Sequence, residues 1–164
     1  MRTADSEAGP GDPQVDVNVL IRLLQGVPEF VAFAQAQQSA GLAYNLAVQA
    51  EFLAGNTAAP AQLLLLEQQY GIQLIRDVSL AEIDSAAARL QAAFHGDPLR
   101  RSLGLADARV AATAFLKNEP LATGDLQFCK RLADLAIAVQ YVGSGRAAAK
   151  AAAYIPQPVA IPGP

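Results

Sequence analysis

Two kinds of hydrophobic pattern follow one another along this chain. Short, almost continuous apolar runs are typical of buried strands, whereas longer segments with apolar residues three and four positions apart are typical of helices. The strand-like runs are VDVNVLI (15–21), LAYN (42–45), IQLIRD (72–77), PLATGD (120–125) and IAVQYVG (137–143). Because helical segments separate these runs, the pattern predicts an α/β fold, a three-layer α/β/α sandwich around a mainly parallel central sheet of four or five strands.

Local signals mark the ends of several expected helices. Pro28 suits the first turn of one helix, and Gly71 suits the position just after the end of another. Ser79 and Glu82 form a capping box at the start of a third helix. The helices expected from these signals span residues 28–40, 47–55, 58–71, 79–94, 105–118 and 126–136.

Composition divides the chain into three parts. Residues 1–13 are rich in Gly, Pro and acidic residues, which predicts a disordered leader. Residues 144–164 are rich in Ala and then in Pro, which is typical of a linker or a peripheral arm. The segment between them, residues 14–143, is long enough to form one domain with a sizeable core.

Charge and cysteine content narrow the possible functions. The formal net charge of -3 gives no general basic surface for nucleic acid, although acidic residues gathered around metal ions would reverse the local field. The single cysteine, Cys129, excludes an internal disulfide and a multi-cysteine zinc site, and we expect it to be a small core residue. No stretch approaches about 20 uncharged apolar residues. We therefore expect a soluble, cytoplasmic protein that does not enter a membrane.

Four carboxylates occupy positions that such a fold would bring to one edge of its sheet. Asp16 lies in the first apolar run and Asp125 ends the fourth, and ligands of parallel sheets bind at the carboxyl ends of strands. Glu51 has apolar neighbours within a helix, and Asp107 opens a helix, where the dipole favours an acid. Each acid alone is explained by a helix cap or an ion pair. Together they would repel one another unless a hard cation such as Mg²⁺ or Mn²⁺ bound them.

The four segments that carry these acids resemble the PIN domain family of metal-dependent nucleases, in order and at ordinary spacing over nearly all of residues 14–143. VDVNVLI is similar to the family's opening VDTNVLI, with Val17 where Thr is usual. NLAVQAEFLAG resembles the second block, with Asn45 where Ser is common. LGLADARVAATA is similar to the third, usually LxLADALIAATA, with Arg109 in place of an apolar residue. PLATGDLQF follows the fourth block, PLATxDxxF.

This resemblance implies a catalytic and metal-binding set of Asp16, Glu51, Asp107 and Asp125, supported by Asn18 and Thr123 and holding Mg²⁺ or Mn²⁺. The implied reaction is hydrolysis of an RNA phosphodiester bond by a metal-activated water. Small domains of this family that stand alone are mostly toxins of VapBC-type toxin–antitoxin pairs. The resemblance therefore implies an endoribonuclease toxin, an antitoxin partner and a homodimer.

Four cations lie close in sequence to two of the acids: Arg100, Arg101, Lys130 and Arg131. They are candidates for contacts with phosphates that flank the scissile one, and equally for solvated cations on helix surfaces. The only histidine, His95, lies in a turn-like FHGDP segment and fits a surface position. A metal-free ribonuclease mechanism that needs two histidines is therefore excluded.

Three other functions stay open at this point. A stand-alone nuclease of RNA processing or repair would use the same chemistry. A non-catalytic interaction module is favoured by the Pro-rich end, IPQPVAIPGP, and disfavoured by the intact acids. A phosphatase-like enzyme acting on a phosphomonoester would require a closed small-molecule pocket instead of an open groove.

Overall fold

A computed structural model describes residues 12–164 and contains one parallel sheet with the strand order β3-β2-β1-β4-β5. Every pairing is parallel, and in the central pairing Val15 lies opposite Ala122. The strands are β1 (Gln14–Val15), β2 (Leu42–Tyr44), β3 (Ile72–Leu74), β4 (Leu121–Thr123) and β5 (Val139–Tyr141). The predicted α/β fold with a parallel sheet is confirmed. The strand order reverses between β1 and β4, which is where open α/β sheets bind their ligands.

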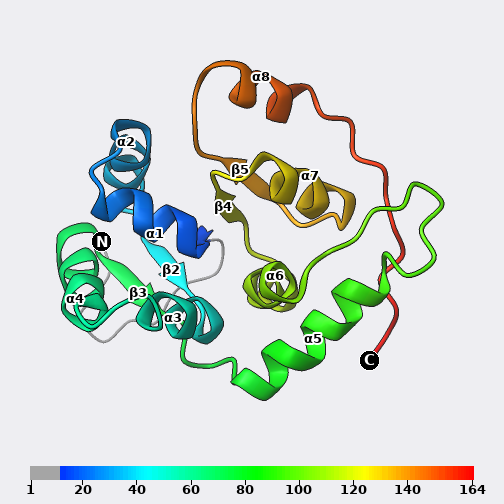
Figure 1. Ribbon diagram of the computed structural model, residues 1–164, viewed down its shortest axis with the longest axis horizontal. Helices are drawn as coiled ribbons and strands as arrows, with labels where there is room; N and C mark the ends of the chain where they lie inside the picture. Colours follow the sequence, from blue (N-terminus) through cyan, green and yellow to red (C-terminus); the bar gives the residue numbers. More distant parts are fainter. Residues whose placement is uncertain (1–11) are drawn as a thin grey trace.

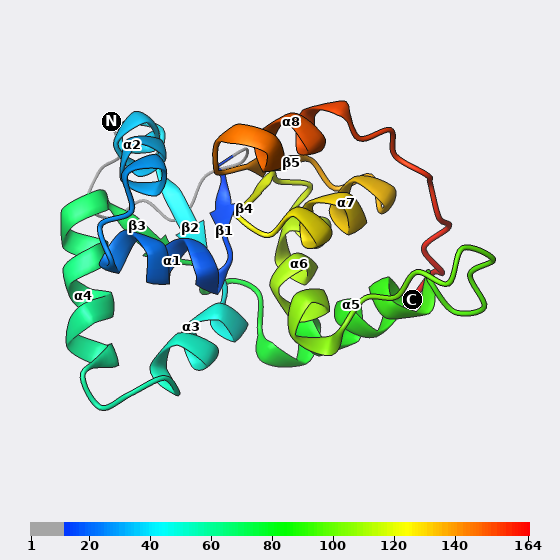
Figure 2. The same cartoon turned by 45° about the horizontal axis from the view of Figure 1, so that its top comes forward.

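Helices cover the sheet on both sides. Figures 1 and 2 show α1 to α4 gathered around β2 and β3, α6 to α8 around β4 and β5, and α5 running along α6. In the described residues the helices are α1 (Val17–Leu24), α2 (Pro28–Gln37), α3 (Leu46–Leu53), α4 (Ala59–Tyr70), α5 (Leu80–Ala92), α6 (Leu105–Lys117), α7 (Leu126–Asp134) and α8 (Gly145–Ala153). The capping box at Ser79 and the left-handed Gly71 are both present, so these sequence signals did mark helix ends.

The first apolar run, VDVNVLI, is not a strand along its whole length. Strand β1 ends at Val15, and Asp16 is the N-cap of α1, which begins at Val17. The run is apolar because α1 packs Val19 and Leu20 into the core. The stretch is thus a strand passing into a helix, and the strand is shorter than the apolar run suggested, because such a run does not distinguish a buried strand from a buried helix.

The C-terminal segment folds back onto the domain. After α8, residues 154–162 run as an extended strap toward α5 (Figure 1). Tyr154 Oη and the Gln157 N–H both donate to Asp134 Oδ1, at 2.6 and 2.9 Å, and the Val159 N–H donates to the Asp134 carbonyl. Val159 also packs against the hydrophobic core. The segment expected to be a linker or arm is thus held by a buried carboxylate.

The expected leader falls mostly outside the described residues, which begin at Asp12. Asp12 and Pro13 are buried, and the Pro13 carbonyl accepts a hydrogen bond from the Ala43 N–H of β2. The backbone contacts with β2 therefore include the residue just before the predicted boundary at residue 14.

Within residues 12–164, no single helix has both the length and the apolar character needed to cross a membrane. Helices α1 and α2 taken together have the length and composition of a membrane span, but they are bent by 109° relative to each other.

Candidate functional site

Two acids are brought together because β1 and β4 are neighbouring parallel strands. Asp16 directly follows β1, and Asp125 follows β4 after one intervening residue. Thr123, the last residue of β4, links them. Its hydroxyl donates to Asp16 Oδ2 at 2.5 Å and accepts from the Asp125 N–H at 3.1 Å. The supporting position expected for Thr123 thus corresponds to a direct contact with one acid and with the backbone of the other.

Asp16 lies in an environment that penalises its negative charge. Only 5% of the residue is exposed, and burial raises the pKa of its carboxyl from 3.8 to about 6. Hydrogen bonds from Thr123 and from the Val19 N–H lower this pKa, whereas the charges of Asp107 and Asp125 raise it further. The carboxylate is therefore held by a helix cap and a hydroxyl, and it stays poorly stabilised near neutral pH.

Asp125 and Asp107 each lie at the start of a helix. Asp125 is the N-cap of α7, and its Oδ1 accepts from the Phe128 N–H at 3.1 Å. Asp107 lies in the first turn of α6, whose N-cap is Gly104. Burial raises the pKa of Asp107, and the charges of Asp125 and Glu51 raise it further. The helix N-termini favour these acids, while their mutual repulsion opposes the charge.

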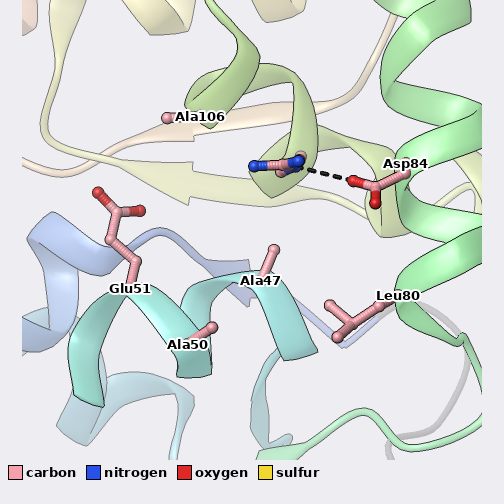
Figure 3. A pocket seen from close by; sticks show the side chains of 7 residues that line it. Ala47, Ala50, Glu51, Leu80, Asp84 and Ala106 are labelled. Carbon is pink, nitrogen blue, oxygen red and sulfur yellow. Dashed lines mark hydrogen bonds and ion pairs between the residues drawn. The ribbon is translucent and has the colours of Figure 1, made fainter. Parts of the chain in front are cut away.

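Glu51 is exposed on α3, and its charge acts on Asp107. It extends from α3 toward the start of α6, where Ala106 lies (Figure 3). The position of α3 relative to α6 is set by Asn45, a buried residue that caps α3 through the Val48 N–H. The Asn45 amide also donates to the Thr113 hydroxyl and to the carbonyls of Arg109 and Val110 on α6. Asn45 therefore ties the helix of Glu51 to the helix of Asp107.

The four acids offer the oxygen ligands that Mg²⁺ and Mn²⁺ prefer, and a cation would relieve the repulsion that raises the pKa values of Asp16 and Asp107. Their donor chemistry therefore fits a hard divalent ion. In the described part of the chain, no group of three or more His, Cys, Asp or Glu side chains is arranged so that it could hold an ion as it stands. The acids share one edge without converging on one point, and the metal set stays a prediction.

The four candidate phosphate-binding cations have different surroundings. Arg101 is only 10% exposed in its side chain and forms ion pairs with Asp97 at 2.9 Å and with Asp134 at 3.2 Å. Arg131 also pairs with Asp134, at 2.8 Å. Lys130 lies over the ring of Tyr154, with its nitrogen 5.6 Å from the ring centre. The structure therefore places three of these cations in the region that holds the C-terminal strap.

The remaining candidates lie as follows. Arg100 and Asn18 are exposed, with Asn18 in the first turn of α1 beside Asp16. His95 is exposed and Cys129 is buried, as the sequence indicated. The sequence did not reveal the bridging role of Asn45, because its only local signal is that of an N-cap.

Two hollows flank Glu51. One has a volume of about 490 Å³ and lies between α3, α5 and α6 (Figure 3). The other, of about 420 Å³, lies between α1, α3 and α4 and includes Ile21 and Phe52. We call the part of the molecule that carries Asp16, Glu51, Asp107 and Asp125 the acidic edge. Because Glu51 lines both hollows, each of them adjoins the acidic edge.

Comparison with known proteins identifies the family and the fold. Residues 14–133 match the PIN domain family. A similar solved structure is the crystal structure of VapBC2 from Rickettsia felis bound to a DNA fragment from their promoter, with a TM-score of 0.63 and 16% identity, covering 79% of this chain and 98% of that chain. Another is a toxin-antitoxin complex from Klebsiella pneumoniae, with a TM-score of 0.57 and 23% identity, covering 79% and 97%. No curated protein gives a significant match.

At these identities the two structures show a shared fold. The family match is more specific, because residues 14–133 contain all four acid-bearing segments in the expected order. The C-terminal strap lies outside the matched range. Sequence blocks, strand order and the acidic sheet edge therefore lead to one conclusion: the chain belongs to the PIN domain family.

Proposed function

We propose that this protein is a divalent-metal-dependent endoribonuclease and the toxin of a type II toxin–antitoxin pair. The observation that carries the nuclease proposal is the environment of Asp16. A carboxylate that is 5% exposed, and whose pKa is raised to about 6 by burial and by neighbouring acids, lies at the switch point of a parallel sheet. Such a buried carboxylate lowers the stability of the folded protein when it is ionised, and perturbed pKa values of this kind cluster at functional sites.

Asp16, Glu51, Asp107 and Asp125 are the residues that would hold Mg²⁺ or Mn²⁺. When bound, such an ion polarises a phosphoryl oxygen and lowers the pKa of a coordinated water. Thr123 orients Asp16 and the backbone of Asp125, so that both acids face the same edge. Asn45 fixes α3 against α6 and so sets the position of Glu51 relative to Asp107.

The toxin assignment is supported by fold and size. The two similar structures, those of VapBC2 and of a toxin-antitoxin complex, are matched over 97–98% of their own chains. By analogy we infer an antitoxin partner and a homodimer for this chain. The Pro-rich end had favoured an interaction module. Residues 154–162 contact their own domain through Asp134, Arg101 and Arg89. Because these intramolecular contacts occupy the segment, it gives less support to an interaction module than its composition suggested.

The test is cleavage of structured and single-stranded RNAs by the purified protein in Mg²⁺, in Mn²⁺ and in EDTA. Asp16→Asn is the inactive variant. Asp77→Asn is the matched control, because Asp77 pairs with Lys117 at the opposite end of α6 from Asp107, about 15 Å along the helix. Cleavage that needs a divalent ion, disappears in Asp16→Asn and persists in Asp77→Asn would support the proposal. No cleavage of any RNA, with no divalent-ion binding by calorimetry, would refute it.

The toxin assignment has a separate test. Expression of the wild-type chain should arrest growth, and expression of Asp16→Asn should not. A gene directly upstream whose product binds the purified chain and suppresses RNA cleavage would support the antitoxin partner. Growth that is unaffected by an active nuclease would favour an RNA-processing or repair enzyme instead.

A further inference from the structure

The hollow of about 490 Å³ beside Glu51 has a distinctive lining (Figure 3). Small side chains from two facing helices line part of it: Ala47 and Ala50 of α3, and Ala106 of α6. Leu80 and Asp84 of α5, together with Arg109 of α6, complete the lining. The hollow is therefore an alanine-lined space with the acidic edge at one side and a charged pair at another.

The charged pair consists of Arg109 and Asp84. Arg109 Nε donates to Asp84 Oδ1 at 2.8 Å, as the dashed line in Figure 3 marks. The side chains are 43% and 54% exposed, and exposed pairs of this kind add little to stability. This bond uses one of the five guanidinium N–H groups and one of the two carboxylate oxygens. A cation and an anion thus lie side by side at the wall of the hollow, and the guanidinium N–H donors and carboxylate lone pairs that this bond does not use can contact a ligand.

Arg109 belongs to the same face of α6 as Ala106, because the two residues are one helical turn apart. Asp107, between them, interacts electrostatically with Asp125 and Glu51 on the acidic side. One short stretch of α6 therefore contributes to both the acidic edge and the hollow. Arg109 also replaces the apolar residue that is usual in the corresponding block of the family, so the charged pair is a property of this chain.

We propose that this hollow is a subsite for a nucleobase next to the scissile phosphate of RNA, and that Asp84 and Arg109 select guanine. This inference rests on the proposed nuclease function. A base is flat and apolar on its faces, which suits a space lined by alanines, and its polar edge would meet the charged pair. Guanine presents its O6 acceptor beside two N–H donors, N1–H and N2–H. Arg109 donates to O6 and Asp84 accepts from the two N–H groups.

The other bases fit this pair less well. Adenine, cytosine and uracil each present a single N–H or amino donor beside an acceptor on the edge that would face the pair, so the carboxylate loses one hydrogen bond with each of them. Discrimination by a bidentate contact of this kind is worth about 1–3 kcal/mol, which corresponds to a preference of roughly 5- to 150-fold. Because Glu51 lines the same hollow, a base bound there would place its phosphate near the acids.

The test measures binding without catalysis. Four fluorescein-labelled tetranucleotides that differ only in one base are titrated with metal-free protein in EDTA, and the anisotropy gives the Kd. We expect the guanine-containing RNA to bind about tenfold more tightly than the adenine-containing one. Asp84→Asn should remove most of this preference, and Arg109→Leu, which restores an apolar residue, should weaken guanine binding. Asp77→Asn, which alters the other exposed ion pair of α6, should leave both affinities unchanged.

The outcomes separate this inference from the nuclease proposal. Equal affinity for all four bases, in a protein that cleaves RNA in Mg²⁺ or Mn²⁺, would overturn the guanine subsite and leave the nuclease intact. A base preference that survives both substitutions would also overturn it. A protein that neither binds nor cleaves any RNA would overturn the proposed function together with the subsite.

Discussion

Replacing Asp16 with asparagine should stabilise the metal-free protein and should abolish the proposed nuclease activity. The carboxyl pKa of Asp16 rises from 3.8 to about 6 in the folded state, chiefly through burial. Each pH unit of such a difference corresponds to about 1.4 kcal/mol, so the ionised carboxylate destabilises the fold by about 3 kcal/mol at neutral pH. Asparagine carries no charge and caps a helix as well as aspartate does. It also retains a carbonyl oxygen to accept from the Val19 N–H.

The sign of the pH dependence follows from the direction of the shift. Between about pH 4 and pH 6 the folded protein holds the Asp16 proton that the unfolded chain has released, so stability falls as the pH rises through this window. Asp16→Asn removes this loss. We expect a gain of about 1–3 kcal/mol at pH 7.5, equivalent to an increase in Tm of roughly 3–10 °C, and almost no gain at pH 4.

Urea denaturation in EDTA across pH 4–8 measures this effect. Asp77→Asn is the control, and its effect on stability should have the opposite sign. The hydrogen bond from Lys117 lowers the pKa of Asp77, so removing the Asp77 carboxylate should slightly destabilise the folded protein at neutral pH. If Asp16 belongs to the proposed metal site, adding Mg²⁺ should stabilise the wild type more than the variant, because the variant lacks the charge of Asp16. The reasoning would be refuted if Asp16→Asn were no more stable than wild type at pH 7.5, or if its gain in stability at pH 4 were as large. Either result would show that burial does not destabilise the ionised Asp16 carboxylate.

Three further substitutions probe contacts of the site and the strap. Thr123→Val keeps the shape of a fully buried side chain but removes the donor to Asp16, so the pKa of Asp16 should rise above about 6 and the pH–activity profile should shift to higher pH. Asn45→Ser retains an N-cap but loses the amide donors to α6, and should lower the free energy of unfolding in urea by about 1–3 kcal/mol. Tyr154→Phe removes the hydroxyl that donates to Asp134, which should lower the free energy of unfolding by about 1–2 kcal/mol and increase proteolysis of the strap. Unchanged proteolysis would mean that the other contacts are sufficient to hold the strap.

Much of the fold could be read from local patterns. The alternation of apolar runs and helical segments predicted a parallel α/β sheet, and four of the five strands lie within the predicted runs. The capping box at Ser79 and the glycine at position 71 identified helix ends, because such caps depend on residues within a few positions of one another. The acids at positions 16 and 125 were placed at one edge because parallel neighbouring strands end together.

Tertiary structure decided what depends on residues far apart in the chain. Residues 16–21 of the first run form an N-cap and a helix because Val19 and Leu20 pack into the core, which periodicity over seven residues does not reveal. Arg101 was a candidate for phosphate binding, but a buried Asp134 thirty-three positions away holds it. The pairing of Asp84 with Arg109 depends in the same way on α5 packing along α6. Local sequence thus determined the elements and the candidate acids, whereas long-range packing determined which charges are paired and which remain exposed for a ligand.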